Sequence, residues 1–598
     1  MSTRHRGIVR KRTTWLFLVF ALLYVGIVGR LVWVQVYRGH QYQKWAREIR
    51  HREMPIEASR GCIYDRNGRA LAISIESASI FAQPRLVKNP TMTAARLAPL
   101  IGEDAGSIEK KLRSRKKFVW LVRKIDARVG DEIRKLSTEF PGIGRERDTK
   151  RVYPAGSLAA QIIGFTNIDN KGVEGLECVK NNVLMGRDGS MRAELDGERR
   201  VIPETRHIIR EPENGKDIYL TIDTNIQHIA ERAISRMAEK YHPQSACAVV
   251  MDPHTGEILA LANYPFFDPN NIRSTKGAPW RNRAVADLYE PGSTLKVVTV
   301  AAALNEDISQ YEVVAHCSGR EKIKGGRISC TLHHPFMNGH GGVDMYRLIQ
   351  QSCNIAAAHL AFRMGSEKLL DYEKAFGLVD KADAGFGCEA VGSMIPAKDW
   401  RLIRLANIGF GQGIAVTPLQ MTCVYSTIAN GGVYTQPKIL REMKNADGSV
   451  FEAFKIGTQR RVVSKKAAFT TAKMLTSCVQ VGTGKKAKIN GRTVAGKTGS
   501  AQVAKPRGGY EPGVFIASFM GFSPSYKPKL AIAVVVNRPQ GSHWGAAVAA
   551  PVFQEIGEKA LWYLKVPSDA PTDKDIKQKQ NGDRKRIVKN LQVWGSGT

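Results

Sequence analysis

The chain has 598 residues, of which 43% are hydrophobic and 24% are charged. These values are typical of a globular protein, and the length excludes one ordinary domain and suffices for two or three. The formal net charge of +34 favours an anionic neighbour, which by charge alone is nucleic acid, an acidic lipid surface or an acidic polymer.

The N-terminal segment indicates a membrane. Residues 1–12 carry five Arg or Lys side chains and no acid, and residues 13–37 hold a single charge, Arg30. About twenty helical residues cross a hydrocarbon core of roughly 30 Å, and the leading basic cluster favours a cytoplasmic N-terminus. A cleaved signal peptide is the alternative, but the apolar run is long and no A-x-A site closes it. We predict a cytoplasmic tail (1–13), one helix spanning the inner membrane (14–36) and the rest in the periplasm, which argues against nucleic acid.

The region from 37 to 240 is predicted to form a first domain outside the membrane. Residues 58–75, ASRGCIYDRNGRALAISI, indicate two strands joined by a tight Asp-Arg-Asn-Gly turn. Residues 220–241 indicate the end of a strand followed by a helix, with Asp223 or Thr224 as its N-cap.

A second domain is predicted over residues 245–567. It opens with a hairpin, ACAVVMDPHTGEILALANYP, and closes with two further strands, IASFMGFSPS and KLAIAVVVNRP, and a helix-like segment. Strands at both ends with helices between them predict an α+β fold with one central antiparallel sheet. The polar, Lys-rich residues 568–598 are predicted to be a disordered tail.

The nine cysteines form an odd, dispersed set without a C-x-x-C pair, so the sequence predicts neither a disulfide framework nor a metal site. Cys317 and Cys330 flank a predicted hairpin that turns at Gly325 and Gly326. An exported hairpin can carry a disulfide there, and two free thiols are the equally open alternative.

Ser293 and Lys296 lie three residues apart after a Pro-Gly break, in YEPGSTLKVV, at the start of an apolar helical run. Residues at i and i+3 share one helix face, so Lys296 lies beside the Ser293 hydroxyl. The Ser-x-x-Lys pattern occurs twice more in highly charged surroundings, but only this copy begins a buried helix, where free N–H groups favour developing negative charge.

Two further motifs follow in the chain. QSCN places Ser352 and Asn354 two residues apart, and AGKTGSAQ contains the single Lys-Thr-Gly sequence of the chain, Lys497 to Gly499. We expect Gly499 to let a substrate lie against an edge strand without interference from a Cβ atom. In this order, the three motifs are the serine-enzyme set of penicillin-binding proteins and class A β-lactamases.

The chain resembles a class B penicillin-binding protein, a monofunctional peptidoglycan D,D-transpeptidase, over nearly its whole length. The likeness lies in RGCIYDRNGRALA, GVEGLE, YEPGSTLK, GFGQGIAVTPLQM, GTGKKA, VAGKTGSAQ and SFMGFSPSYKPKLAIAVVV. The departures are small: Cys353 stands at the variable centre of Ser-x-Asn, and Ser500 stands where Thr is usual. The resemblance implies an elongated α/β pedestal of the penicillin-binding-protein dimerisation type (37–240) and a β-lactamase-like transpeptidase domain (245–567).

The motifs suggest a different catalytic role for each residue. Ser293 is the candidate nucleophile, and Lys296 can accept its proton only as a neutral amine, which requires its pKa to fall from about 10.4 to about 7. Burial and the nearby cation of Lys497 are the expected causes. Ser352 would relay protons to the leaving amine, and Asn354 would hold the substrate amide.

The resemblance also implies that Thr498 and Ser500 bind the terminal carboxylate of the substrate and that the backbone N–H groups of Ser293 and Ser500 form the oxyanion hole. It implies no metal and no cofactor. The expected partners are peptidoglycan stem peptides on a lipid-linked precursor polymer, β-lactam antibiotics, a polytopic glycan polymerase and division proteins.

The expected reaction is transpeptidation, because no E-x-x-L-N motif supplies the glutamate that directs water in class A lactamases. A D,D-carboxypeptidase with the same residues, or a protein that acts mainly as a scaffold, are the alternatives. Arg30 would be the scaffold's intramembrane contact, unless it snorkels to the outer interface. Length and motif texture favour the septal, division-type enzyme over the elongation type.

Overall fold

The computed structural model describes residues 3–136, 139–194, 202–274, 277, 279–330, 339–505 and 509–572. They fall into two compact units, the first comprising residues 1–59 and 186–214 and the second residues 60–185 and 215–598. The predicted disordered tail therefore lies, beyond residue 572, outside the described residues.

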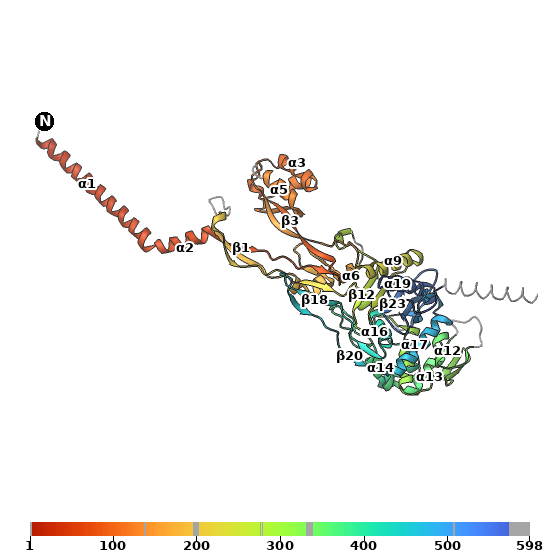
Figure 1. Ribbon diagram of the computed structural model, residues 1–598. Coiled ribbons are helices and arrows are strands. Elements are labelled where there is room, and N and C mark those ends of the chain that lie inside the picture. The colour runs from red at the N-terminus through yellow and green to blue at the C-terminus, as the bar shows by residue number, and fades with distance from the viewer. Residues whose placement is uncertain are drawn as a thin grey trace, which may run out of the picture. The chain divides into compact units, whose positions relative to one another are not determined.

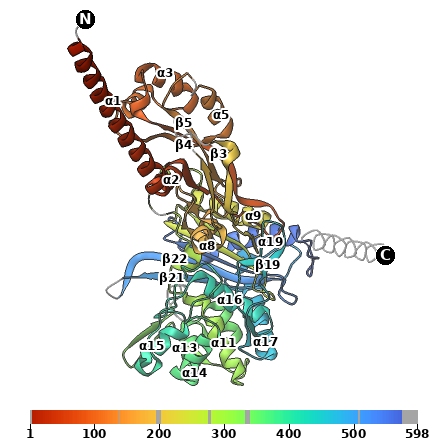
Figure 2. The ribbon, with the colours of Figure 1, turned by 90° about the vertical axis from the view of Figure 1, so that its left-hand side faces the viewer.

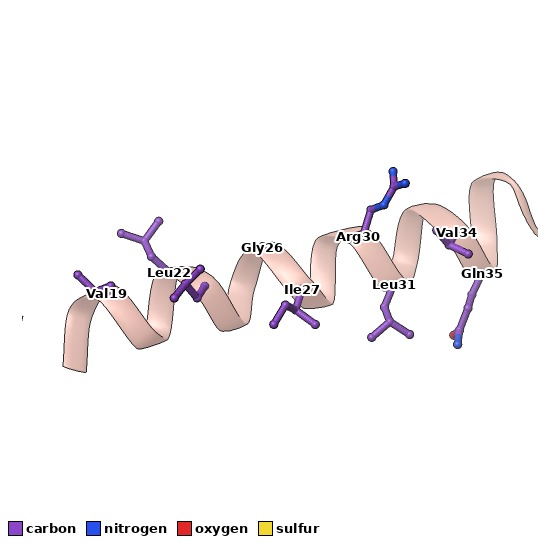
Figure 3. A pocket seen from close by; sticks show the side chains of 9 residues that line it. Val19, Leu22, Gly26, Ile27, Arg30, Leu31, Val34 and Gln35 are labelled. Carbon is purple, nitrogen blue, oxygen red and sulfur yellow. The ribbon is translucent and has the colours of Figure 1, made fainter. Parts of the chain in front are cut away.

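The first unit begins with helix α1 (Thr3–Val32), which continues as the π-helical turn η1 (Trp33–Tyr37) (Figure 1). Within the described part of the chain, Gly7–Tyr37 is the one helical stretch long and apolar enough to span a membrane, with a mean hydropathy of 2.3. Its side chains are exposed, and Arg30 projects from the helix among apolar residues (Figure 3). This helix suggests a single-pass membrane protein.

After α2 (Gly39–Arg50), the first unit holds a small antiparallel sheet in the order β1-β8-β9. Strand β1 covers His51–Ile56, β8 covers Gly189–Glu194 and β9 covers His207–Arg210. The chain thus leaves this unit after residue 59 and returns to it at residue 186.

The second unit contains a seven-stranded sheet in the order β19-β18-β10-β2-β3-β4, with β5 also paired to β3. Strands β2 (Ile63–Tyr64) and β3 (Ala70–Ala82) are the hairpin predicted from the sequence. Asp65 fixes its turn, because one carboxylate oxygen accepts backbone N–H groups of Asn67 and Arg69, each at 2.8 Å. The remaining strands of this sheet are β4 (Val119–Asp126), β5 (Ile143–Val152), β10 (Asp217–Leu220), β18 (Leu440–Lys444) and β19 (Val450–Ala453).

This sheet crosses the predicted domain boundary at 240–245, since β18 and β19 lie in the sequence of the second predicted domain, β18 pairs with β10, and β19 pairs with β18. The helices α3 (Pro90–Ile101), α4 (Ala105–Leu112) and α5 (Ala127–Leu136) enclose a separate apolar cluster with the far ends of β3, β4 and β5.

A five-stranded antiparallel sheet in the order β12-β11-β23-β22-β21 forms the centre of the rest of the unit (Figure 2). The predicted hairpin is β11 (Ser245–Met251) and β12 (Ile258–Tyr264), and the late strands are β21 (Ala495–Ala504), β22 (Tyr510–Ser523) and β23 (Leu530–Asn537). The predicted α+β fold and its central antiparallel sheet are confirmed.

Helices cover both faces of this sheet. Helices α9 (Thr224–Tyr241) and α19 (Ala550–Tyr563) pack on one face, where Asp223 caps α9 as predicted. The other face supports the helices α11 (Lys296–Asn305), α13 (Asn354–Met364), α16 (Pro418–Ala429) and α17 (Lys465–Gln480). Strand β21 is the free edge of the sheet and carries the Lys-Thr-Gly motif beside the start of α11.

Candidate active site

The three sequence motifs meet at one cavity of about 240 Å³. It lies between the turn that precedes α11, the C-terminal end of α12 (Met345–Gln351), strand β21 and the start of α18 (Gly545–Val548). The lining residues are Ser293, Ser352, Thr483, Thr498, Ser500, Trp544 and Ala546.

Ser293 lies in a single 3-10 turn, η5 (Gly292–Thr294), that leads directly into α11. Gly292 enters this turn with φ +56°, a conformation that favours glycine, and a Cβ there would approach the Cβ of Ala501 to 3.2 Å. Thr294 anchors the turn: its hydroxyl donates to the Pro291 carbonyl at 2.8 Å, and its own carbonyl accepts the hydroxyl of buried Tyr425 at 2.9 Å. These two hydrogen bonds therefore hold the turn that carries Ser293.

Lys296 is fully buried, and its Nζ atom has four oxygen neighbours. The carbonyl oxygen of Ser352 and Oδ1 of Asn354 accept from it at 2.7 and 2.6 Å. The hydroxyl oxygens of Ser293 and Ser352 lie at 3.1 and 3.2 Å. The predicted meeting of Lys296 with Ser293 is thus present in the structure.

Ser352 links the two lysines to Ser293. Its hydroxyl oxygen accepts from Lys497 Nζ at 3.0 Å, and the hydroxyl donates to Ser293 Oγ at 2.9 Å. It caps the C-terminus of α12 with φ +61°, which is uncommon for a residue other than glycine and typical of functional positions. This conformation turns the chain from α12 into α13.

Burial lowers the pKa of both lysines. Desolvation, followed by the neighbouring cation of Lys497, lowers the pKa of Lys296 from 10.5 to about 7. Desolvation also lowers the pKa of Lys497. The lowered pKa of Lys296 therefore follows mainly from its burial at the head of α11, with the positive charge of Lys497 as the second cause.

Strand β21 presents alternate side chains to the cavity. Thr498 and Ser500 line it, while Gly499 between them faces the other way. A Cβ at Gly499 would meet Ser518 Oγ at 2.3 Å and Thr294 Cγ2 at 3.0 Å. The glycine therefore lets η5 and β22 approach the strand, which differs from the expectation that it makes room for a ligand.

Asn354 has a more internal position than expected. Its Oδ1 accepts from Lys296, and its Nδ2 donates to the carbonyl of Ser329 at 2.9 Å. In this arrangement the amide orients the amine of Lys296, and Asn354 is not among the residues that line the cavity.

Thr483 and Trp544 are cavity residues to which the sequence reasoning assigned no role. Thr483 Oγ1 accepts from the Thr498 hydroxyl at 3.0 Å, which ties the loop after α17 to β21. Thr483 belongs to GTGKKA, a motif noted only for its resemblance, whereas no local pattern distinguishes Trp544. On the same side, the backbone N–H of Gly545 donates to Ser500 Oγ at 3.0 Å.

The disulfide considered for the hairpin is not formed. Cys317 and Cys330 are both free thiols and both buried. The hairpin itself is present as β14 (Arg320–Ile323) and β15 (Gly326–Ser329).

Comparison with known proteins extends this picture. The penicillin-binding protein transpeptidase domain matches residues 246–558, and the penicillin-binding protein dimerisation domain matches residues 55–220. Stage V sporulation protein D of Bacillus subtilis is 34% identical over 595 residues, which cover 98% of this chain and 90% of that protein. Peptidoglycan D,D-transpeptidase FtsI of Escherichia coli is 31% identical over 581 residues, covering 96% and 93%.

Solved structures agree. Penicillin-binding protein 3 from Mycobacterium tuberculosis in complex with aztreonam matches with a TM-score of 0.68 at 27% identity, covering 87% of this chain and 99% of that one. A peptidoglycan synthetase from Bifidobacterium adolescentis matches with a TM-score of 0.69 at 26% identity, covering 88% and 99%.

A serine beside two buried lysines, at the edge of an antiparallel sheet covered by helices, defines a serine acyl-transfer enzyme. The matches over nearly the whole length narrow this class: the chain belongs to the class B penicillin-binding proteins and is a peptidoglycan D,D-transpeptidase. The resemblance noted in the sequence is thereby confirmed.

Proposed function

We propose that Ser293 is the nucleophile that attacks the D-Ala-D-Ala bond of a donor stem peptide. The observation that carries this assignment is Lys296 Nζ, which lies 3.1 Å from Ser293 Oγ with its pKa lowered to about 7. A pKa near the operating pH is the optimum for a general base.

The contacts of Lys296 support its role as the base. Two of its neighbours, the Ser352 carbonyl and Asn354 Oδ1, can only accept hydrogen bonds, so they take the two N–H groups of a neutral amine. The lone pair is then left for the Ser293 hydroxyl, because the Ser352 hydroxyl already donates its proton to Ser293 Oγ. Asn354 and the Ser352 carbonyl thus orient the base toward the nucleophile.

Acylation then couples two bond changes to two proton transfers. As the Ser293 Oγ–carbon bond forms, Lys296 takes the hydroxyl proton, and as the peptide C–N bond breaks, the proton passes through Ser352 to the leaving D-alanine amine. An amine of an acceptor stem peptide attacks the ester in the second half, loses its proton through the same groups and restores the Ser293 hydroxyl. The hydrogen bond between the two serine hydroxyls supports this relay.

The terminal carboxylate of the donor peptide would lie against β21. Hydroxyls of Thr498, Ser500 and Thr483 line the cavity, and Lys497 adds a buried positive charge behind them. The backbone N–H groups of Ser293 and Ser500 would form the oxyanion hole, where each donor contributes about 3 kcal/mol.

The fate of the acyl-enzyme favours transfer to an amine over hydrolysis. None of the described cavity-lining residues is Asp or Glu, and residues 331–338 and 506–508, which the structure does not describe, contain neither. Glu290, three residues before Ser293, is engaged by the backbone N–H of Gly413 and the hydroxyl of Tyr510. Among the residues that the structure describes, no carboxylate lines the cavity to hold a hydrolytic water.

The lifetime of the β-lactam adduct tests this proposal. Losing a positioned general base slows hydrolysis by roughly 10²–10⁴-fold, so protein labelled with fluorescent penicillin should keep its label for many minutes after free drug is removed. Release of hydrolysed drug with many turnovers per enzyme would contradict it. With a synthetic stem peptide, cross-linked product is expected, whereas release of D-alanine alone would identify a D,D-carboxypeptidase.

We further propose that the catalytic unit lies outside the cytoplasm and works at the division septum, with a glycan polymerase and division proteins as partners. The basic N-terminus before the apolar helix and the likeness to FtsI support this. Depletion should give filamentous cells, and round cells would indicate the elongation machinery instead. Rescue of growth by Ser293→Ala would show that the scaffold role is the essential one.

A further inference from the structure

Four side chains from the segment 317–353 gather behind the Ser352–Asn354 motif. Cys317 ends β13 (Ala315–Cys317), Cys330 follows β15, His340 precedes β16 (Gly341–Val343), and Cys353 is the N-cap of α13. One sulfur or ring-nitrogen atom from each lies within 4.8 Å of those of the other three. Three loops and a helix therefore converge on one small volume.

The spacing of these atoms matches a tetrahedral metal site. With Zn–S at about 2.3 Å and Zn–N at about 2.0 Å, tetrahedral ligands stand about 3.8 Å apart for two sulfurs and about 3.5 Å apart for sulfur and nitrogen. The Sγ atoms of Cys330 and Cys353 are 3.7 Å apart, and Cys317 Sγ lies 3.3 Å from His340 Nδ1. Small movements would bring all four to one ion.

The surroundings suit sulfur ligands that carry negative charge. The three cysteines are almost fully buried, at 0% exposure for Cys317, 4% for Cys330 and 0% for Cys353. The backbone N–H of Asn354 donates to Cys330 Sγ at 3.1 Å, and that of Ala356 donates to Cys353 Sγ at 3.4 Å. Hydrogen bonds of this kind stabilise metal-bound thiolates and orient them.

We propose that Cys317, Cys330, His340 and Cys353 bind one structural Zn²⁺ ion. Three sulfurs and one imidazole are a standard closed zinc set, and soft sulfur ligands in tetrahedral geometry favour zinc over magnesium or calcium. Binding replaces the thiol protons of the three cysteines, which are released to solvent.

The ion acts on catalysis through position. Cys353 lies between Ser352 and Asn354, which supply three of the four oxygen neighbours of Lys296 Nζ. Ligation ties this segment to β13, β15 and β16, so it fixes the Ser352 hydroxyl and the Asn354 amide relative to the base. Cys353 is thus a positioning residue, and the zinc itself takes no part in acyl transfer.

A disulfide between Cys330 and Cys353 is the competing arrangement. It requires the two sulfur atoms to approach from 3.7 Å to about 2.05 Å, and it does not involve Cys317 and His340, whose Sγ and Nδ1 atoms are 3.3 Å apart. The proximity of all four potential ligand atoms therefore favours a bound metal ion over a disulfide.

Metal analysis of the full-length protein tests the proposal. The protein is purified in detergent without chelator, and its metals are measured by mass spectrometry. One zinc per chain is expected in the wild type and none in His340→Ala. His340→Cys should regain zinc, because four cysteines are also a standard zinc set. Cys423→Ser, which removes a buried thiol of α16 outside the cluster, should keep it.

A second measurement links the ion to the site. Exchange with Co²⁺ should give the visible and near-ultraviolet bands of a tetrahedral cobalt–thiolate centre. Removal by chelator should slow acylation by penicillin by about 10- to 100-fold, with recovery on adding Zn²⁺. Wild-type protein that binds no zinc even when supplied with it, or that carries a Cys330–Cys353 disulfide, would overturn the proposal. Ser293→Ala should still hold zinc, so this result is independent of the proposed nucleophile.

Discussion

Lys296 has surroundings that hold an amine without its proton. Its Nζ is fully buried, it touches two carbonyl-type acceptors and two hydroxyls, and the described residues place no carboxylate in contact with it. A pKa lowered from 10.5 to about 7 corresponds to roughly 5 kcal/mol of preference for the neutral form. The folded state thus stabilises the neutral amine of Lys296, the form that can accept a proton, relative to the charged form.

This environment predicts the pH dependence of acylation. The rate of labelling by fluorescent penicillin should rise with pH through a midpoint near pH 7, because only the neutral Lys296 accepts the Ser293 proton. Stopped-flow or gel-based labelling between about pH 5.5 and 8.5 measures it. A flat profile over that range would show that Lys296 is not the base.

Removing the second cation should move that midpoint. Lys497→Met deletes a positive charge but keeps much of the buried volume, so the pKa of Lys296 should rise and the midpoint should shift to higher pH. The maximal rate should also fall, because Ser352 loses a hydrogen-bond donor. Lys473→Met, which removes an exposed lysine of α17, should leave the profile unchanged. An unshifted midpoint in Lys497→Met would leave burial as the sole cause.

Short sequence patterns correctly predicted several individual hairpins and helices. The hairpins β2–β3 and β11–β12 and the capped helix α9 follow from apolar alternation, turn residues and an N-cap aspartate that lie within a few residues of one another. The pairing of Ser293 with Lys296 is also local, since it needs only one turn of helix. These features were correct in the sequence analysis for that reason.

These short patterns did not predict contacts between segments that are distant in the sequence. Nothing near residues 440–453 indicates that β18 and β19 join β10 in a sheet with strands from the start of the chain. The convergence of Cys317, Cys330 and Cys353 likewise depends on how loops fold together, so counting C-x-x-C pairs missed it. The room needed behind Gly499 arises from the packing of η5 and β22.

One long-range contact yields a stability prediction. The motifs RGCIYDRNG and GVEGLE meet where Glu177, fully buried, accepts from Arg60 Nε at 2.7 Å and Arg151 Nε at 2.6 Å. Glu177→Ala leaves two buried guanidinium groups without their counterion and should lower the free energy of unfolding by about 3–5 kcal/mol.

Thermal unfolding of a fragment that lacks residues 1–37 measures this loss, with Glu76→Ala on the exposed part of β3 as the control. The control should change stability by less than about 0.5 kcal/mol. Equal unfolding temperatures for Glu177→Ala and the control would mean that this buried network does not stabilise the fold.

The apolar N-terminal helix and the candidate active site belong to different compact units. The apolar helix belongs to the first unit, whereas every cavity-lining residue belongs to the second. The protein should stay with membranes after a salt wash, and deletion of residues 1–37 should release a soluble protein that acylates at the full-length rate. A folded fragment that fails to react with penicillin would show that catalysis needs the membrane segment.

The proposed mechanism depends on Ser293 as the acylated residue and on Lys296 as its base. Intact-protein and peptide mass spectrometry of penicillin-treated protein tests both assignments, because it identifies the residue that carries the adduct. We predict one penicillin per chain on the peptide that contains Ser293, no adduct in Ser293→Ala, and labelling slowed by roughly 10²–10⁴-fold in Lys296→Ala. An adduct on another residue, or labelling that persists in folded Ser293→Ala, would contradict the account.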